Sequence, residues 1–380
     1  MDDKDKKYKY KVASLFAGIG GIDLGFEQAG AEIVWANEMD KNACITYREN
    51  FKHTLVEEDI RKVNEHSVPP IDILTAGWPC VAFSIAGRRH GMHYKCHDCG
   101  HEHFVTFEEY IGTPACPECG GHTEAKDPRG TLFYDIIRFL RAKQPKAFLL
   151  ENVKNLKSHD NGRTFRVIEE MLRAEGYYFT SQVLNTMHYG NIPQNRERIF
   201  IVGFKEEKAL QNFRFPEPRP LTRTIDDILE RDKKQDDKYY YTQESQYYPM
   251  LAEAMRRRDT VYQLRRVYVR ENQSNVCPTL TANMGTGGHN VPLILDDYGI
   301  RKITPREALS FQGFPEDFKI PEGMADSHIY KQAGNAVSVP VVKAIAENII
   351  KALDSVYMDS ADNEEKSIDS PRMEQLELFI

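Results

Sequence analysis

The amino-acid sequence predicts an α/β fold: a doubly wound, mostly parallel, Rossmann-like sheet with a smaller, mixed, strand-rich domain attached. Short apolar strands alternate with amphipathic helices from residue 9 to about residue 204, a pattern typical of parallel sheets covered by helices on both faces. The chain has 380 residues, 41% of them hydrophobic and 28% charged. This ordinary globular composition suffices for one large and one smaller domain.

The N-terminal part supplies the first expected elements of the sheet. Residues 9–15 form a short buried strand, and residues 16–21, with the sequence Phe-Ala-Gly-Ile-Gly-Gly, make a tight turn before a helix at 22–29. A strand at 32–36 and a helix at 41–50 then repeat the strand-and-helix order.

Three further apolar runs are suited to central parallel strands. They are residues 71–76, 147–150 and 198–203. A helix at 132–142 lies between the first two runs. We therefore place the main domain at 9–214, after a frayed leader at 1–8.

The character of the chain changes beyond the main domain. Residues 215–220 carry three prolines, and residues 261–269 alternate enough to form a strand. We place the smaller domain at 215–300. A return segment at 301–353, ending in an amphipathic helix, is expected to pack back on the first domain. The tail, 354–380, lacks periodicity and is expected to be disordered.

The distribution of charge matters more than the net value of −7. The tail holds eight acids and two bases, so it carries −6 of that charge. Between Arg256 and Arg270 six arginines face one aspartate, a local charge of +5. Phosphate binding depends on such local charge, although a solvated surface run explains these arginines equally well.

Membrane insertion and export are not expected. No apolar run approaches the roughly 18–20 residues that a membrane-spanning helix requires. The first seven residues are charged without an apolar core behind them, so they are not a secretory signal. A cytoplasmic protein is the expectation.

The turn at Gly18 and Gly20, after a strand and before a helix, exposes backbone N–H groups to a ligand. Glu38, at the end of the second strand, is placed to bind ribose hydroxyls. A dinucleotide fingerprint would need a third glycine where Asp23 stands. Asp59 is a candidate acceptor for an adenine amino group, with a helix cap or a surface acid as the alternative.

Cys80 follows the expected strand at 71–76 in a proline-containing loop, which is where α/β folds keep their chemistry. A lone cysteine is usually a small buried hydrophobe, but this one belongs to a series of motifs. These are Phe16-Ala-Gly-Ile-Gly-Gly, Asn37-Glu38, Pro79-Cys80 with Phe83-Ser84, Glu151-Asn152-Val153, Gln194-x-Arg196-x-Arg198, Arg306-Glu307 and Gly334-Asn335. In this order they resemble the DNA (cytosine-5) methyltransferase family, over residues 12–350 apart from one insertion and the target-reading region.

The resemblance implies that the main domain binds S-adenosylmethionine. The residues implied in cofactor binding are Phe16, Gly18, Gly20, Glu38, Met39, Asp59, Pro79 and Asn335. Met39, where an aromatic residue is often found, would lie against the adenine.

The resemblance also implies a set of catalytic roles. The Cys80 thiolate adds to C6 of cytosine, which makes C5 nucleophilic toward the methyl group. Glu151 contacts N3 and the exocyclic amine, and proton donation there calls for a pKa raised by burial. Arg196 is expected to hold the base's O2, and Arg198 to brace the site or the phosphate. The alternative is that Glu151 and the two arginines form an ion-pair network with a purely structural role.

Because this chemistry is impossible inside a stacked duplex, the resemblance implies a flipped-out cytosine. A loop from Val81 to about His93 is expected to close over the base. The family commonly has glutamine or asparagine after the nucleophile, so Val81 leaves the contacts of that loop with DNA open.

The domain at 215–300 corresponds to the target-recognition region of the family. Its arginines are candidates for guanine edges, and Thr279-Leu280 matches a common dipeptide of the region. The expected DNA-binding residues are Ser84, Arg265, Arg266, Thr279 and Leu280. Duplex DNA is thus the expected partner of a monomeric enzyme. The recognition sequence, and whether a cognate restriction endonuclease exists as genetic partner, stay open.

An insertion at 94–122 contains two Cys-x-x-Cys pairs. These four residues are Cys96, Cys99, Cys116 and Cys119. Two such pairs are typical of a structural, closed Zn²⁺ site, and a disulfide pair or four free thiols are the alternatives. Whether the insertion braces the loop or contacts DNA stays open.

The C-terminal residues resemble the short peptide with which bacterial proteins dock on the replicative sliding clamp. The matching positions are Gln375, Leu376, Leu378 and Phe379. Apolar anchors on a flexible tether suit small-pocket peptide recognition, and an apolar end without function is the alternative.

Three other functions compete with DNA methylation. An RNA-modifying relative would keep the fold, but the arginine-rich region and the zinc insertion disfavour it. A non-catalytic DNA-binding protein is disfavoured by the intact set Cys80, Glu151, Arg196 and Arg198. A nicotinamide oxidoreductase depends on the glycine turn alone and lacks the third glycine.

Overall fold

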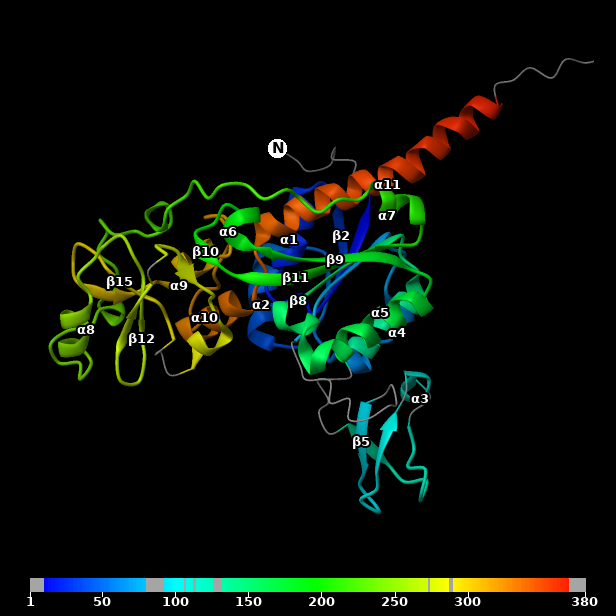
Figure 1. Cartoon of the computed structure of the whole chain (residues 1–380), viewed down its shortest axis with the longest axis horizontal. Helices are drawn as coiled ribbons and strands as arrows, with labels where there is room; N and C mark the ends of the chain where they lie inside the picture. Colours follow the sequence, from blue (N-terminus) through cyan, green and yellow to red (C-terminus); the bar gives the residue numbers. More distant parts are fainter. Residues whose placement is uncertain are drawn as a thin grey trace, which may run out of the picture.

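The computed structural model describes residues 10–79, 92–105, 107–111, 114–125, 132–272, 274–286 and 290–368. Its centre is a seven-stranded sheet with the strand order β3-β2-β1-β4-β8-β11-β9 (Figure 1). These strands are β1 (Lys11–Leu15), β2 (Glu32–Asn37), β3 (Thr54–Val56), β4 (Ile73–Gly77), β8 (Ala147–Val153), β9 (Tyr178–Asn185) and β11 (Glu197–Phe204). The predicted α/β fold with a large, mostly parallel sheet is confirmed.

Strand direction departs from the expectation at one place. Strands β1, β2, β3, β4 and β8 pair in parallel, whereas β11 runs antiparallel to both β8 and β9. The expected parallel strand at 198–203 therefore exists, but its direction was predicted wrongly. A continuous apolar run indicates that a strand is buried on both faces of a sheet. It does not indicate whether the strand runs parallel or antiparallel to its neighbours.

Helices cover both faces of the sheet. On one face, α4 (Leu132–Lys143) and α5 (Arg163–Ala174) pack on alternate strand residues such as Leu74 and Leu150. On the other face, α1 (Gly21–Gln28) and α11 (Val339–Ile368) cover the residues between them, such as Ile73 and Leu149. The alternation follows from the two-residue period of side chains along a strand.

The remaining elements connect these layers or lie at their edges. They are α2 (Lys41–Asn50), η2 (Ile60–Lys62), η3 (Glu65–Ser67), η4 (Lys154–Lys157), η5 (His159–Gly162), α6 (Thr186–Tyr189), β10 (Gln194–Asn195), α7 (Glu207–Asn212), η6 (Ile225–Asp227), η7 (Asp237–Tyr239), β14 (Cys277–Pro278), η8 (Ala282–Gly285), α9 (Pro305–Ser310) and α10 (Asp326–Asn335). Within the described ranges, no helix is long and apolar enough to cross a membrane.

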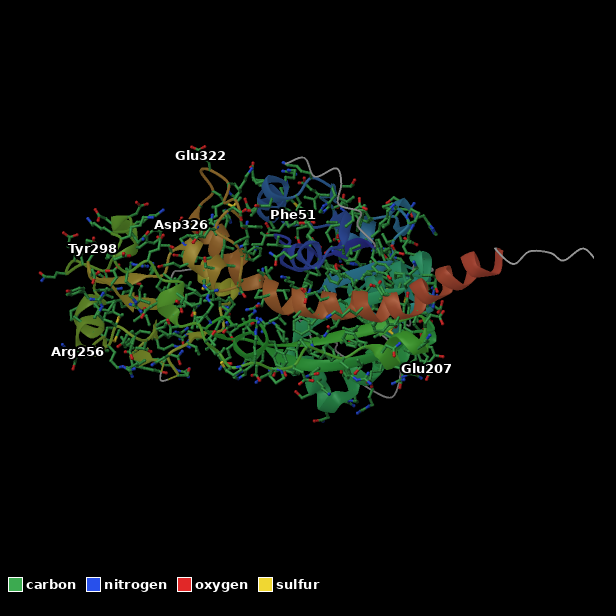
Figure 2. The ribbon with its side chains drawn as sticks, turned by 90° about the horizontal axis from the view of Figure 1, so that it is seen from above. Phe51, Glu207, Arg256, Tyr298, Glu322 and Asp326 are labelled. Atoms are coloured by element: carbon green, nitrogen blue, oxygen red, sulfur yellow. The ribbon has the colours of Figure 1, made fainter. Side chains whose placement is uncertain are left out.

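A second, antiparallel sheet lies beside the main one, with the order β13-β12-β15-β16. Its strands are β12 (Tyr262–Leu264), β13 (Val269–Glu271), β15 (Leu293–Leu295) and β16 (Ile300–Lys302). With α8 (Tyr248–Ala254) it encloses a small core of its own. Figure 2 labels Arg256 and Tyr298 at this end of the molecule.

The cysteine-rich insertion forms a three-stranded antiparallel sheet that projects from the main domain (Figure 1). It consists of β5 (Met92–Cys96), β6 (Glu102–Val105), α3 (Phe107–Ile111) and β7 (Thr123–Ala125).

The expected disorder from residue 354 onward is wrong for its first part, because α11 continues to Ile368. The helix is anchored past Leu353: the Tyr10 hydroxyl donates to Asp354 at 2.7 Å, and the Lys146 ammonium lies 4.8 Å from the Tyr357 ring centroid. Because these contacts join the tail to residues far away in the sequence, the sequence pattern of the tail alone does not predict them. The clamp-like peptide, Gln375, Leu376, Leu378 and Phe379, lies outside the described residues.

Candidate active site

A cavity of about 400 Å³ opens at the carboxyl ends of β1, β2, β4 and β8, where open α/β sheets bind their ligands. Seven of the eight residues that the resemblance assigns to the cofactor line it, and so do the acid and both arginines of the expected catalytic set. These residues are Phe16, Gly18, Glu38, Met39, Asp59, Pro79, Asn335, Glu151, Arg196 and Arg198. Segments from the two ends of the chain thus meet in one site.

Gly20 is the expected cofactor residue that does not line the cavity. Its φ is +86°, and a Cβ there would lie 2.1 Å from Cε2 of Phe51. A side chain would therefore be strained and would collide with the ring, which Figure 2 labels near α1. Gly20 is therefore required for packing behind the turn, and its expected contact with the ligand stays a prediction.

Glu38 is fixed at the cavity by backbone groups. One carboxylate oxygen accepts from the N–H of Gly18 at 2.9 Å. The other accepts from the N–H groups of Met39 at 2.8 Å and Asp40 at 2.7 Å. The carboxylate is thus held at the glycine turn, and its remaining lone pairs can accept hydrogen bonds from hydroxyl groups of a ligand.

Asp59 is a helix cap that also lines the cavity. It caps η2 by accepting from the N–H of Arg61 at 3.1 Å, and its carboxylate pairs with the Arg61 guanidinium. The hydrogen bond from the Arg61 side chain lowers the pKa of Asp59. Because Asp59 also lines the cavity, it presents an ionised acceptor there.

Glu151 lies at the end of β8 with 7% of its surface exposed. Burial raises its pKa, while the charges of Arg198 and Arg196 act in the opposite direction. Gly77 is its neighbour on β4, and a Cβ there would lie 3.4 Å from Oε2 of Glu151. The buried carboxyl therefore has room at the cavity wall and a raised pKa suited to proton donation.

The two arginines make different contacts. Arg198 Nε lies 3.2 Å from Oε1 of Glu151, so Arg198 is paired with the buried acid. Arg196, 1% exposed, donates to the carbonyls of Leu280 at 2.7 Å, Gly334 at 3.2 Å and Ala336 at 2.7 Å. Its terminal nitrogens thus hold two other segments of the chain, one at Leu280 and one at residues 334–336.

Burial lowers the pKa of Arg196 to about 9, so the guanidinium stays charged at neutral pH. Its Nε is buried and has no hydrogen-bond partner among the described residues. Buried donors are normally satisfied, and this one belongs to a residue that lines the cavity. A ligand acceptor or a water molecule is the expected partner.

Cys80 and Ser84 lie outside the described residues, as does Val81. The structure describes the chain up to Pro79, which is exposed and lines the cavity. Asn152 holds this end of β4 in place, because its Nδ2 donates to the carbonyl of Trp78 at 3.0 Å. The residue next to Cys80 is therefore fixed at the cavity.

Sequence reasoning missed one contact at the rim of the cavity. Lys331 on α10 pairs with Asp40 at 2.7 Å, and both residues line the cavity. The two residues are 291 positions apart, and no local pattern relates them.

The expected DNA-binding residues fall into two groups. Arg265 and the exposed Arg266 lie in the turn between β12 and β13. Thr279 and Leu280 lie beside Arg196, since Thr279 donates to the carbonyl of Asn195 at 2.6 Å. Leu280 is 1% exposed, so its side chain packs in the interior, and a contact between Leu280 and DNA stays a prediction.

The four insertion cysteines converge. Their sulfur atoms all lie within 4.8 Å of one another, with Cys96–Cys119 at 3.5 Å and Cys99–Cys116 at 3.6 Å. A tetrahedral zinc site with Zn–S bonds of ~2.3 Å has sulfur atoms about 3.8 Å apart. The backbone N–H of Cys99 lowers the pKa of Cys96, whereas contacts with the neighbouring thiols raise the pKa of Cys99 and Cys119 against the backbone hydrogen bonds that lower it.

The comparisons with known proteins agree with this geometry. The sequence model of the family described as C-5 cytosine-specific DNA methylase matches residues 10–101 and 116–351. The chain is 52% identical to the type II methyltransferase M.Bsp6I of Bacillus sp. (strain RFL6) over 345 residues, covering 90% of this chain and 99% of that protein. It is 39% identical to the type II methyltransferase M.SsoII of Shigella sonnei, covering 91% and 82% of the two chains.

Solved structures share the fold. The S. pombe Dnmt2 methyltransferase superposes with a TM-score of 0.65 at 18% identity, covering 91% of this chain and 100% of that one. A putative DNA modification methyltransferase encoded within an E. coli prophage gives 0.60 at 21% identity, with 91% and 100% coverage. Similarity at this level concerns the fold alone, whereas the family match and the close relatives cover nearly the whole chain. The chain therefore belongs to the C-5 cytosine-specific DNA methylase family and is a DNA (cytosine-5-)-methyltransferase.

Proposed function

We propose that this enzyme methylates C5 of a flipped-out cytosine in a specific duplex sequence, through a covalent bond between Cys80 and C6. The observation that carries the proposal is the cavity in which Glu151, with its raised pKa, and Arg198 face the glycine turn. Pro79, the residue before Cys80, lines the same cavity. An acid and a cofactor turn that line one cavity, with the expected nucleophile next in sequence to a lining residue, suit attack on a base removed from its stack.

S-adenosylmethionine, when bound, supplies the methyl group. The chain's own residues provide its binding site. Glu38 accepts from the ribose hydroxyls, since backbone N–H groups already fix its orientation. Asp59 accepts from the adenine amino group, and Met39 covers the ring. Gly18 gives the ligand access to the turn, where a Cβ would meet no atom within 4 Å.

The residues around the base act in a defined order. The Cys80 thiolate adds to C6, and Glu151 donates a proton toward N3, so that electron density accumulates at C5. Arg198, which pairs with Glu151, holds O2 and limits the negative charge on the acid. After C5 takes the methyl group, a base removes the C5 proton, Cys80 leaves C6 as the thiolate, and N3 returns its proton to Glu151. The enzyme is thereby regenerated.

The cysteine cluster fits a structural Zn²⁺. Four thiolates close the coordination sphere and leave no position for a substrate. Zinc would cross-link the two cysteine pairs. A three-stranded sheet of this size needs such a cross-link because its hydrophobic core is small.

The small antiparallel sheet is proposed to read the target. The turn between β12 and β13 presents Arg265 and Arg266 on an exposed hairpin, which suits guanine edges and phosphates. Relatives named type II methyltransferases make a cognate restriction endonuclease a reasonable genetic partner. The C-terminal peptide from Gln375 to Phe379 is proposed to bind a sliding clamp on the strength of its sequence alone.

Methyl transfer from S-adenosylmethionine to unmodified DNA tests the central proposal. Nucleoside mass spectrometry and bisulfite sequencing are expected to show 5-methylcytosine at one short motif, and Cys80→Ser should abolish it. With 5-fluorocytosine in the motif, the wild-type protein should form a denaturation-resistant adduct. Labelling of tRNA with no labelling of DNA would overturn the proposal in favour of RNA methylation.

A further inference from the structure

The insertion at 92–125 is joined to the main domain by buried side chains. Tyr94 is 5% exposed and Val105 is 1% exposed, and both belong to the core cluster that includes Phe133 of α4. The ring of Tyr110 on α3 lies 5.5 Å from that of Tyr134 on α4. The base of the insertion is therefore part of the main core, in contrast to its projecting tip (Figure 1).

Tyr110 also supports a buried charge on α4. Its hydroxyl donates to Asp135 Oδ2 at 3.0 Å, and Asp135 is 0% exposed. The other oxygen of Asp135 accepts from Arg138 Nη2 at 2.9 Å. A buried ion pair is stable only when its members are fully hydrogen-bonded, so the insertion supplies one of the bonds that hold Arg138 in its orientation.

Arg138 in turn holds one wall of the cavity. It donates to the carbonyls of Ile60 and Val63, each at 2.8 Å, and it pairs with Glu65. Ile60 directly follows Asp59, and both of these residues line the cavity. A continuous chain of hydrogen bonds thus runs from the insertion to the expected adenine side of the cofactor site.

The charge of the insertion argues against a role in binding phosphates. Residues 92–125 contain one lysine and six acids, a formal charge of −5 with neutral histidines. Four thiolates around one Zn²⁺ would make this charge more negative still. Contact with the DNA backbone requires the opposite sign.

We propose that the metal-bound insertion positions the cofactor pocket, and that Tyr110 is the positioning residue that links them. The metal keeps β5, β6 and β7 folded, which holds Tyr110 against Asp135. Asp135 then orients Arg138, whose two carbonyl contacts fix the segment that carries Asp59. This inference rests on the proposed function, because it takes S-adenosylmethionine as the occupant of the cavity.

The test compares cofactor affinity in four forms of the full-length protein. They are the zinc-loaded wild type, the wild type after chelation, Tyr110→Phe and Glu108→Gln. The Tyr110→Phe variant keeps the ring packing and removes the hydroxyl. Glu108→Gln is the matched control, since Glu108 lies on the same helix and pairs with the exposed Arg141 at 3.1 Å, outside the path to Arg138. Calorimetry with S-adenosylhomocysteine gives Kd, and steady-state kinetics give KM for each substrate.

Tyr110→Phe and chelation should raise the Kd for S-adenosylhomocysteine roughly three- to thirtyfold, the range typical of coupling through packed networks. The KM for S-adenosylmethionine should rise in parallel in Tyr110→Phe, while the KM for DNA stays unchanged. The control should bind as the wild type does. A hydroxyl that serves stability alone would lower the melting temperature and leave both constants unchanged.

Two results would overturn the inference. One is an unchanged Kd in Tyr110→Phe with its zinc retained, and the other is an equal loss of affinity in Glu108→Gln. If chelation unfolds the protein, the zinc-loaded Tyr110→Phe variant still decides the matter. Absence of any cofactor binding by the zinc-loaded wild type would instead contradict the proposed function, so the two failures are distinguishable.

Discussion

At the scale of single residues, the site depends on one buried carboxyl group and on the cation beside it. Glu151 is removed from water, which favours its neutral form, whereas Arg198 favours the charged form. Burial is the larger influence. The pKa of Glu151 therefore lies above that of an ordinary glutamic acid, which suits a group that donates a proton.

Replacement of Glu151 by glutamine should reduce kcat by roughly 10²–10⁴-fold. Because burial raises the pKa of Glu151, the protonated form persists to a higher pH than in an ordinary carboxyl group. The kcat of the wild type should fall as pH rises through this raised pKa, and the fall should be absent in Glu151→Gln. A pH series of single-turnover rates checks this, with S-adenosylhomocysteine affinity as the control for folding. An identical alkaline limb in both proteins would contradict the assignment.

The two arginines should separate stability from catalysis. Arg196→Met removes three hydrogen bonds to carbonyls, so the free energy of unfolding should fall by about 3 kcal/mol or more. Arg198→Met should leave the melting temperature closer to that of the wild type and lower kcat instead. Thermal denaturation and methyl-transfer kinetics on the same samples decide it. The opposite pattern would restore the expectation that Arg196 meets the base.

At the scale of elements, the turn of the β12–β13 hairpin exposes apolar side chains next to arginines. Val267 is 84% exposed and Tyr268 is 53% exposed, and both follow Arg265 and Arg266. Exposed apolar side chains beside arginines suit insertion into a DNA groove, where they contact base edges and methyl groups.

Arg266→Ala should weaken DNA binding and reduce the slope of log K against log salt by about one. Arg258→Ala is the control from the same basic run, because Arg258 is already paired with Asp297 at 2.5 Å. Fluorescence anisotropy with the methylated motif and a scrambled duplex, across a salt series, measures both effects. Equal losses in the two variants would indicate a general effect of charge and remove the hairpin as a reader.

The sequence predicts elements whose signals are local. It does not predict strand direction, hydrogen-bond partners or side-chain burial, which depend on contacts between elements. The helix at 41–50 was placed correctly, since its apolar period and the cap at Asp40 are local. The direction of β11 depends on its partners, and the contrast between Arg196 and Arg198 depends on which carbonyls lie nearby. Leu280 shows the same limit, because a motif match does not indicate whether a side chain is buried. The four cysteines were predictable because ligand spacing is itself a local pattern.

At the scale of the whole molecule, α11 ties the two ends of the chain together. It packs beside α1, where a Cβ on Gly25 would lie 2.6 Å from Val342 Cγ1. Its later turns contact Tyr10 at the start of the described chain. The return of the C-terminal segment to the first domain therefore completes the core rather than adding to its surface.

Two truncations should separate this structural role from the terminal peptide. Ending the chain after Ile368 should leave the melting temperature and DNA methylation unchanged and abolish any binding to a bacterial sliding clamp. Ending it after Leu353 removes Asp354 and Tyr357, so the melting temperature should fall by several degrees. Scanning calorimetry and surface plasmon resonance with purified clamp measure the two effects. Clamp binding by the chain that ends at Ile368 would contradict the role of the peptide.

Zinc content is the remaining property of the whole molecule to measure. The purified protein should contain about one zinc per chain, and a Cys99→Ser, Cys119→Ser double variant should contain none, because two thiolates no longer close a tetrahedral site. Inductively coupled plasma mass spectrometry checks this. Intact mass under non-reducing conditions separates a metal site from disulfides.

The entry and exit of the metal-binding insertion lie on neighbouring paired strands, with Lys95 opposite Glu124 and Cys96 opposite Thr123. The sequence model of the family is interrupted inside the insertion, between residues 101 and 116, and matches the chain on either side of that break. A segment whose two ends are adjacent can be acquired or lost in evolution as one genetic cassette, without shifting the register of the host sheet. Methyltransferases of this family that lack the cassette must then secure the same wall of the pocket by other side chains.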